Sequence, residues 1–199
     1  MSESLPSLVN YGQPTLMRVQ DPVSDSDIAA DAFQQRLQVL RHCMIAYQGI
    51  GIAAPQVGWN ARVFCMGIED SSDRYPGADR VPFAFWINPR ITAASGRNWA
   101  WEGCLSVPGM RGWIARPSTI EVSGLDHRGQ TVQCRLDGFA ARVFQHEYDH
   151  LDGVLFPMRV SHSRFLVPEL ALVERSSWND DWPSVGSRKT EPGQLSPQE

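Results

Sequence analysis

The segment QHEYDHLDG, residues 145–153, combines residue types and a spacing that are typical of a metal site. His146 and His150 are four residues apart, so on a helix their imidazoles would lie on one face, one turn apart, and could share one cation. Glu147 would then lie beside the ion and next to the attacking water rather than on the ion. The pattern predicts a metal-dependent hydrolase. It identifies neither the third ligand nor the bond that is broken.

The third ligand is expected upstream of the histidines. The acidic residues and the histidine downstream of His150 do not have the spacing that third ligands have in zinc peptidases. Cys104 stands in a glycine-containing loop, EGCLSVPG at 102–109, after an expected strand. A thiolate with two imidazoles binds zinc or ferrous iron and leaves a fourth position for water. The remaining cysteines are interpreted as small buried residues, and they are Cys43, Cys65 and Cys134.

The segment QGIGIAAPQVG, residues 48–58, contains two glycines directly after an expected helix. A dinucleotide fingerprint is excluded, because it needs a strand before the glycines and a helix opening after them. Glycines in this place favour a helix C-cap and a backbone that comes close to a ligand. Gln56 is then a side-chain hydrogen-bond donor at the edge of that segment.

The elements that must position these residues are two helices and several strands. SDSD at 24–27 followed by apolar residues at helical spacing predicts a helix that ends at Gly49. Strand-like runs occupy 61–69, 83–91 and 97–107, and 118–138 predicts two strands joined by a turn at 126–129. A second helix from Phe139 to Leu151 carries both histidines. Because helices and strands do not alternate, the expected fold class is α+β, with mixed or antiparallel sheets packed around a central metal-binding helix.

The chain length fits one catalytic domain, which we assign to residues 1–175. Residues 162–175 are expected to form a short helix, with Pro168 in its first turn or breaking it. Residues 176–199 are rich in Ser, Pro, Gly and charge and are expected to be a flexible tail. Trp99 and Trp101, just before the cysteine loop, are expected to pack in the core or on a sheet.

The bulk composition narrows the class and the location of the protein. A net charge of −4 gives no electrostatic reason to bind nucleic acid or an anionic membrane. The sequence has no apolar run near the roughly 20 residues of a membrane span, and its N-terminus lacks the pattern of a signal peptide. Four cysteines without a CxxC pair are typical of free thiols in a reducing compartment. We therefore expect a cytoplasmic protein.

Three blocks of the sequence, in this order, resemble the three signature motifs of the peptide deformylase family. They are GIGIAAPQ at 49–56, EGCLS at 102–106 and QHEYDH at 145–150, and they match the family patterns G-x-G-x-A-A-x-Q, E-G-C-[LS]-S and Q-H-E-x-D-H without a substitution. The resemblance covers about residues 8–160, with Gln13 where the family has Asp. It implies a metallohydrolase that removes the N-formyl group from the initiator methionine of new bacterial polypeptides and releases formate.

The resemblance also implies a role for each matching residue. The implied metal ligands are Cys104, His146 and His150. Glu147 would be the general acid and base, and Gln56 and the backbone N–H of Leu105 would donate to the oxygen of the formyl group. Gly51 resembles the glycine whose backbone pairs with the bound peptide, which would add itself beside a strand.

Further positions are implied around the substrate. The methionine side chain would lie in a pocket formed by Ile50, Leu105, Val143 and Phe144. Arg111 matches an arginine near the outer end of the substrate. Glu102 and Arg116 are expected to pair and to support the ligands from behind.

The family implies Fe²⁺ as the native ion, with Zn²⁺, Ni²⁺ or Co²⁺ as substitutes, and these ions all suit one thiolate and two imidazoles. The implied partners are N-formylmethionyl peptides and nascent chains. Several bacterial members dock on the ribosome through a basic C-terminal helix. The segment after Glu174 is short of Lys and Arg, which argues against the same docking here.

Two alternatives have different ligands. A zinc endopeptidase of the H-E-x-x-H type would use a downstream glutamate and would cut internal peptide bonds. A metal-stabilised or peptide-binding module without catalysis would close the site with a fourth protein ligand.

Overall fold

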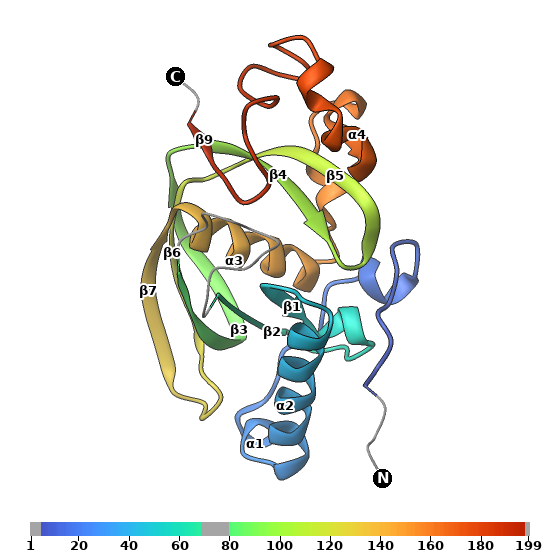
Figure 1. The fold of residues 1–199 in the computed structure, drawn as a ribbon. Coiled ribbons are helices and arrows are strands. Elements are labelled where there is room, and N and C mark those ends of the chain that lie inside the picture. Colours follow the sequence, from blue (N-terminus) through green and yellow to red (C-terminus); the bar gives the residue numbers. More distant parts are fainter. Residues whose placement is uncertain (1–4, 69–79, 198–199) are drawn as a thin grey trace.

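A computed structural model describes residues 5–68 and 80–197 of the chain, and in it helix α3, Gly138–Leu151, lies between two antiparallel sheets (Figure 1). The larger sheet has the strand order β1-β2-β3-β6-β7 and the smaller sheet has the order β8-β5-β4-β9. This arrangement is the expected α+β class with a central helix. None of the helices in the described residues combines the length and the apolarity that a membrane crossing requires.

The first predicted helix is present as two helices. Helix α1 spans Asp25–Ile28, and the side chain of Ser24 caps it by accepting a hydrogen bond from the N–H of Asp27. Helix α2 spans Asp31–Ala46 and buries Phe33 and Leu37 in one apolar stripe. It ends just before the glycine segment, which places that segment next to the larger sheet.

The larger sheet is a set of antiparallel pairs. Its strands are β1 Gly51–Ala53, β2 Val63–Ile68, β3 Val81–Ser95, β6 Thr119–Leu125 and β7 Thr131–Asp137. The predicted turn between β6 and β7 is present, because a carboxylate oxygen of Asp126 accepts from the N–H groups of Arg128 and Gln130. Gly51 belongs to a short strand and pairs with Met66. The helix C-cap expected at the glycines is Tyr47 instead, and it is followed by Gln48 in the left-handed conformation.

The smaller sheet carries the cysteine loop. Its strands are β4 Asn98–Cys104, β5 Val107–Arg116, β8 Leu166–Pro168 and β9 Ser196–Pro197. The run expected to continue to residue 107 ends at Cys104, which pairs with Val107 across a two-residue turn. That turn holds the cysteine above α3.

Short helical segments connect the sheets. They are η1 Pro14–Met17, η2 Ala54–Val57, η3 Phe156–Arg159, η4 Ser163–Phe165, α4 Glu169–Val173 and η5 Arg175–Ser177. Pro168 breaks the helix expected over 162–175, because β8 ends at this residue and α4 begins after it.

The C-terminal segment differs from the flexible tail expected over residues 176–199. Residues 196 and 197 pair with Asn98 and Trp99 of β4, and Ser187 is fully buried. The physical reason is that apolar rings of the smaller sheet need cover, which Trp178 helps to supply. Cys134 also differs from expectation, because its place on β7 leaves it exposed.

Candidate metal centre and active site

The structure brings together the three residues predicted as metal ligands. Cys104 comes from the end of β4, and His146 and His150 come from one face of α3. One ligand atom of each residue lies within 4.8 Å of the other two, and Cys104 Sγ is 3.3 Å from His150 Nε2. One thiolate and two imidazoles fit a divalent ion with a position left for water or substrate.

His146 is oriented by a buried carboxylate. Its Nδ1 is 3.0 Å from an oxygen of Glu102, which leaves Nε2 for an ion. Glu102 also accepts hydrogen bonds from Arg116, at 2.6 and 2.9 Å, and from Arg142 at 2.5 Å. The predicted pairing of Glu102 with Arg116 is therefore present. Burial favours the neutral acid, but these arginines and His146 hold the pKa of Glu102 well below its usual value.

Glu147 lies beside the three ligands with an unused carboxylate oxygen. The residue is 4% exposed, and its Oε2 has no hydrogen-bond partner among the described residues. Burial raises its pKa to about 7, against the opposing effect of His146 and Arg116. A carboxyl group with a pKa near neutrality can both accept and release a proton at the pH of the cell.

Gln56 is held in one orientation by its neighbours. Its Oε1 accepts from the N–H of Ala53 at 2.8 Å, and its Nε2 donates to Ser106 Oγ at 3.2 Å and to Cys104 Sγ at 3.5 Å. The amide N–H groups therefore face the cysteine loop. Ser106 was given no role from the sequence, and its place as the last residue of the EGCLS motif was the only local signal.

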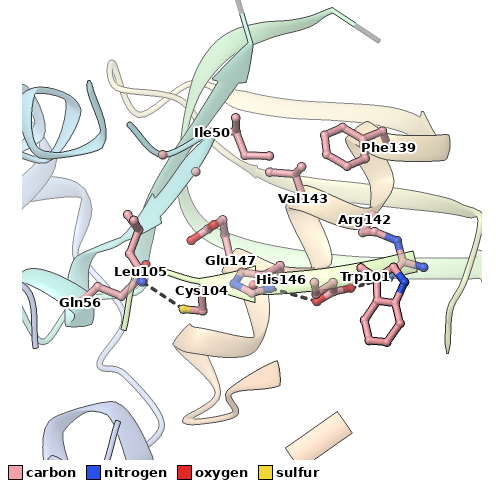
Figure 2. A pocket seen from close by; sticks show the side chains of 14 residues that line it. Ile50, Gln56, Trp101, Cys104, Leu105, Phe139, Arg142, Val143, His146 and Glu147 are labelled. Atoms are coloured by element: carbon pink, nitrogen blue, oxygen red, sulfur yellow. Dashed lines mark hydrogen bonds and ion pairs between the residues drawn. The ribbon is translucent and has the colours of Figure 1, made fainter. Parts of the chain in front are cut away.

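A pocket opens beside Glu147 and extends between α3, β1 and β4 (Figure 2). The predicted residues Ile50, Leu105 and Val143 line it, and Gly51 lies at its edge. Gly51 is in close contact with the acid, because a Cβ added there would lie 2.5 Å from Glu147 Oε1. The backbone glycine and the carboxylate thus share one end of the pocket.

Phe144 was wrongly predicted to line this pocket. It is fully buried in the core, where its ring lies 5.0 Å from Phe64 and from Trp86. A helix turns by about 100° per residue, so Phe144 faces the larger sheet while Val143 faces the pocket. Phe139, one turn before Val143, lines the pocket instead.

Two further pocket residues were missed by the sequence analysis, and they lie at the same end as Phe139 (Figure 2). Trp101 belongs to β4 and Arg142 to α3. Burial lowers the pKa of Arg142 to about 10, despite its contact with Glu102.

Arg111 lies on the other side of the cysteine loop. It lines a separate cleft of about 180 Å³ together with Cys104 and Leu105. Its guanidinium pairs with the carboxylate of Glu169 at the start of α4, with Nε 3.0 Å from Oε1. The outer end of this region therefore carries an ion pair rather than an isolated cation.

Comparison with known proteins identifies relatives along most of the chain. The family model described as polypeptide deformylase matches residues 6–165. Peptide deformylase 1 of Nitrosomonas europaea is 39% identical over 158 residues, which are 79% of this chain and 88% of that protein. Peptide deformylase 1 of Prochlorococcus marinus is 42% identical over 157 residues, which are 78% of this chain and 81% of that protein.

Solved structures agree with these sequence matches. The Met-Ala-Ser complex of the class I type b peptide deformylase from Acinetobacter baumannii has a TM-score of 0.76 and 35% identity, and covers 80% of this chain and all of that chain. The peptide deformylase of Thermotoga maritima has a TM-score of 0.70 and 34% identity, with the same coverage. With the metal-ligand group and the flanking acid in place, this chain belongs to the polypeptide deformylase family.

Proposed function

We propose that this protein removes the formyl group from the N-terminal formyl-methionine of newly made polypeptides and releases formate. The observation that carries the proposal is the buried carboxylate of Glu147, which lies between an open group of three metal ligands and an apolar pocket. A related structure from Acinetobacter baumannii holds Met-Ala-Ser, a peptide that begins with methionine. The proposed partners are formylmethionyl peptides and nascent chains in the cytoplasm.

The proposed metal ligands are Cys104, His146 and His150. A divalent ion held there would polarise the formyl carbonyl and lower the pKa of a water from 15.7 toward roughly 7. Fe²⁺ is the proposed native ion, and Zn²⁺, Ni²⁺ or Co²⁺ would substitute, because one thiolate and two imidazoles accept each of them.

The protein groups around the scissile bond have complementary roles. Glu147 takes the proton of the attacking water and delivers it to the departing nitrogen, so the C–N bond breaks and a free amine forms. The backbone N–H of Leu105 donates to the formyl oxygen as negative charge develops on it. The Nε2 of Gln56 joins it by exchanging its long 3.5 Å contact with Cys104 Sγ for the formyl oxygen, while it keeps its bond to Ser106. Removing one such donor typically costs about 3 kcal/mol of barrier.

The pocket would hold the methionine side chain of the substrate. Ile50, Leu105 and Val143 supply apolar contacts close to the reacting group. The backbone of Gly51, on the short strand β1, would pair with the extended peptide, and Arg111 would lie near the outer end of the peptide.

The test is formate release from formyl-Met-Ala-Ser by protein purified without oxygen, with the bound metal determined in the same sample. We expect one metal ion per chain and equal amounts of formate and free N-terminal amine. A zinc endopeptidase would cut internal bonds of a longer blocked peptide, and a non-catalytic module would release no formate. Either of these results would contradict the proposal.

A further inference from the structure

The C-terminal segment from residue 178 to residue 197, here called the clasp, lies beyond the family match, which ends at residue 165. It packs along β4 in the smaller sheet (Figure 1). Ser187 is its buried centre, with Oγ 2.9 Å from the carbonyl oxygen of Trp182 and 2.6 Å from that of Ser184. An ion pair between Arg188 and Asp180 closes the same turn. The clasp therefore has internal bonds of its own.

The first contact of the clasp is with Trp101, which lines the pocket (Figure 2). The indole N–H of Trp101 donates to the carbonyl oxygen of Ser187 at 2.8 Å, and the ring of Trp178 lies 6.1 Å from the Trp101 ring. The neighbouring residues Trp99 and Trp113 offer a contrast, because their indole N–H groups have no partner among the described residues. Of these three tryptophans, Trp101 is thus the one that lines the pocket and the one whose indole N–H bonds the clasp.

Two more contacts reach the same wall of the pocket. Strand β9 pairs with Asn98, whose carbonyl and side-chain oxygens accept from Arg142 Nη2 at 3.0 and 2.6 Å. Leu195 packs against the core cluster that contains Phe139. Trp101 therefore bonds the clasp directly, Arg142 bonds a residue that the clasp pairs with, and Phe139 belongs to a core cluster against which the clasp packs.

We propose that the clasp is a specificity element, which fixes the position of Trp101, Phe139 and Arg142 and so sets the size of the pocket for the first side chain of the substrate. This inference rests on the proposed function. The clasp touches neither Glu147 nor the metal ligands in the described contacts, and it reaches His146 only indirectly, through Asn98, Arg142 and Glu102. Its main effect is therefore on substrate selection. A shift of this wall changes how well a side chain fits, and fit determines the orientation of the formyl group.

The test uses the full chain with two pairs of variants. Ser187→Ala removes the hydroxyl that holds the clasp turn, and Ser177→Ala is its control, because that hydroxyl bonds the carbonyl of Glu174 outside the clasp. Trp101→Phe removes the indole donor, and Trp99→Phe is its control, because the Trp99 N–H has no partner among the described residues and its ring stacks on Trp113. The measurement is kcat/KM for formyl-Met-Ala-Ser and for formyl-Phe-Ala-Ser, whose first side chain is bulkier.

We expect Ser187→Ala and Trp101→Phe to reduce the preference for Met over Phe by about three- to ten-fold, which corresponds to one net hydrogen bond. In Ser187→Ala the kcat for the methionine substrate should stay within about two-fold of wild type, since the Ser187 hydroxyl bonds only clasp residues and shares no partner with Glu147 or the three metal ligands. Both controls should keep the wild-type preference.

The proposal is overturned if Ser187→Ala and Trp101→Phe keep the wild-type preference, or if they lower kcat/KM equally for both substrates. If the wild type releases no formate, the proposed function fails, and calorimetric binding of Met-Ala-Ser against Phe-Ala-Ser to the same variants still tests the clasp. Thermal unfolding of each variant shows whether it is folded. If either Ser187→Ala or Trp101→Phe fails to fold, the substrate preference of the other variant decides.

Discussion

Replacing Glu102 by glutamine is expected to weaken both the fold and the metal site. Glu102 is buried, and its two oxygens accept hydrogen bonds from Arg116 and Arg142 and contact Nδ1 of His146. The amide of glutamine has a similar shape but no charge, and its NH₂ group would face a guanidinium. The change therefore leaves two buried arginines short of one negative charge.

The size of the effect follows from burial. Removing one partner of a buried ion pair costs about 3–5 kcal/mol of the free energy of unfolding, because the remaining charge cannot reach water. Arg116 keeps its contact with Asp149 at 2.8 Å, and Arg142 keeps Asn98, so the lower end of that range is expected. Loss of the carboxylate that orients His146 should weaken metal binding by about 10- to 100-fold.

The effect of Glu102→Gln should depend on pH. Burial alone would raise the pKa of Glu102, but Arg116, His146 and Arg142 hold it well below 4.5. A carboxylate whose pKa is depressed in the folded state stabilises the protein above its unfolded pKa, and this contribution is lost as the pH falls through the folded-state pKa. The difference between wild type and variant should be largest near neutral pH and should shrink below about pH 4.

Urea unfolding, after a chelator has removed the metal from wild type and variant, measures the free energy of unfolding. A competitive metal titration measures the affinity for the metal. Asp152→Asn is the matched control, because Asp152 pairs with Arg62 at 2.7 Å but is 39% exposed. Its loss should cost less than about 1 kcal/mol. An unfolding free energy for Glu102→Gln that equals the control, together with unchanged metal affinity, would refute the assigned role of Glu102.

Three further predictions concern the reacting groups. Glu147→Gln should lower formate release by about 10²- to 10⁴-fold while metal analysis still finds the ion, and near wild-type turnover would disprove the proton-transfer role. Cys104→Ala should purify with little metal at unchanged circular dichroism, whereas a full metal content would exclude it as a ligand. Gly51→Ala places a Cβ 2.5 Å from Glu147 Oε1, so kcat/KM for formyl-Met-Ala-Ser should fall with metal retained, and wild-type kinetics would contradict the close contact.

The metal-ligand group was predictable because its signals are local. A four-residue spacing on a helix fixes the relative position of His146 and His150 without knowledge of the rest of the fold. The turn after Cys104 and the helix end before Gly51 were also expected from short segments, although Leu105 and Ser106 form the turn and Gln48 is the left-handed residue after the helix. That these three segments lie close together in space cannot be predicted from any one of them. It was predicted because the three motifs, in their order, resemble those of a known family.

The pocket was less predictable because α3 is buried on more than one face. Val143 and Phe144 are both apolar, and the helix lies between two sheets, so hydrophobicity does not indicate which residue faces the substrate. Once His146 and Glu147 are placed at the pocket, the helical spacing indicates which other residues face it, because Phe139 and Val143 precede them on the same side of the helix. Phe144 belongs to the neighbouring side and packs in the core.

The C-terminal segment was the least predictable element, because its partner is about a hundred residues away in the chain. Its polar composition indicates flexibility when it is considered alone. The smaller sheet, however, presents Trp99, Trp101 and Trp113 as one aromatic cluster, and apolar rings of this size favour any segment that removes them from water. Trp178 and the carbonyl of Ser187 complete that cluster. The C-terminal segment is therefore ordered because it covers the tryptophans that precede the cysteine loop. Neither the role of these tryptophans nor the order of the segment could be predicted from its own local sequence.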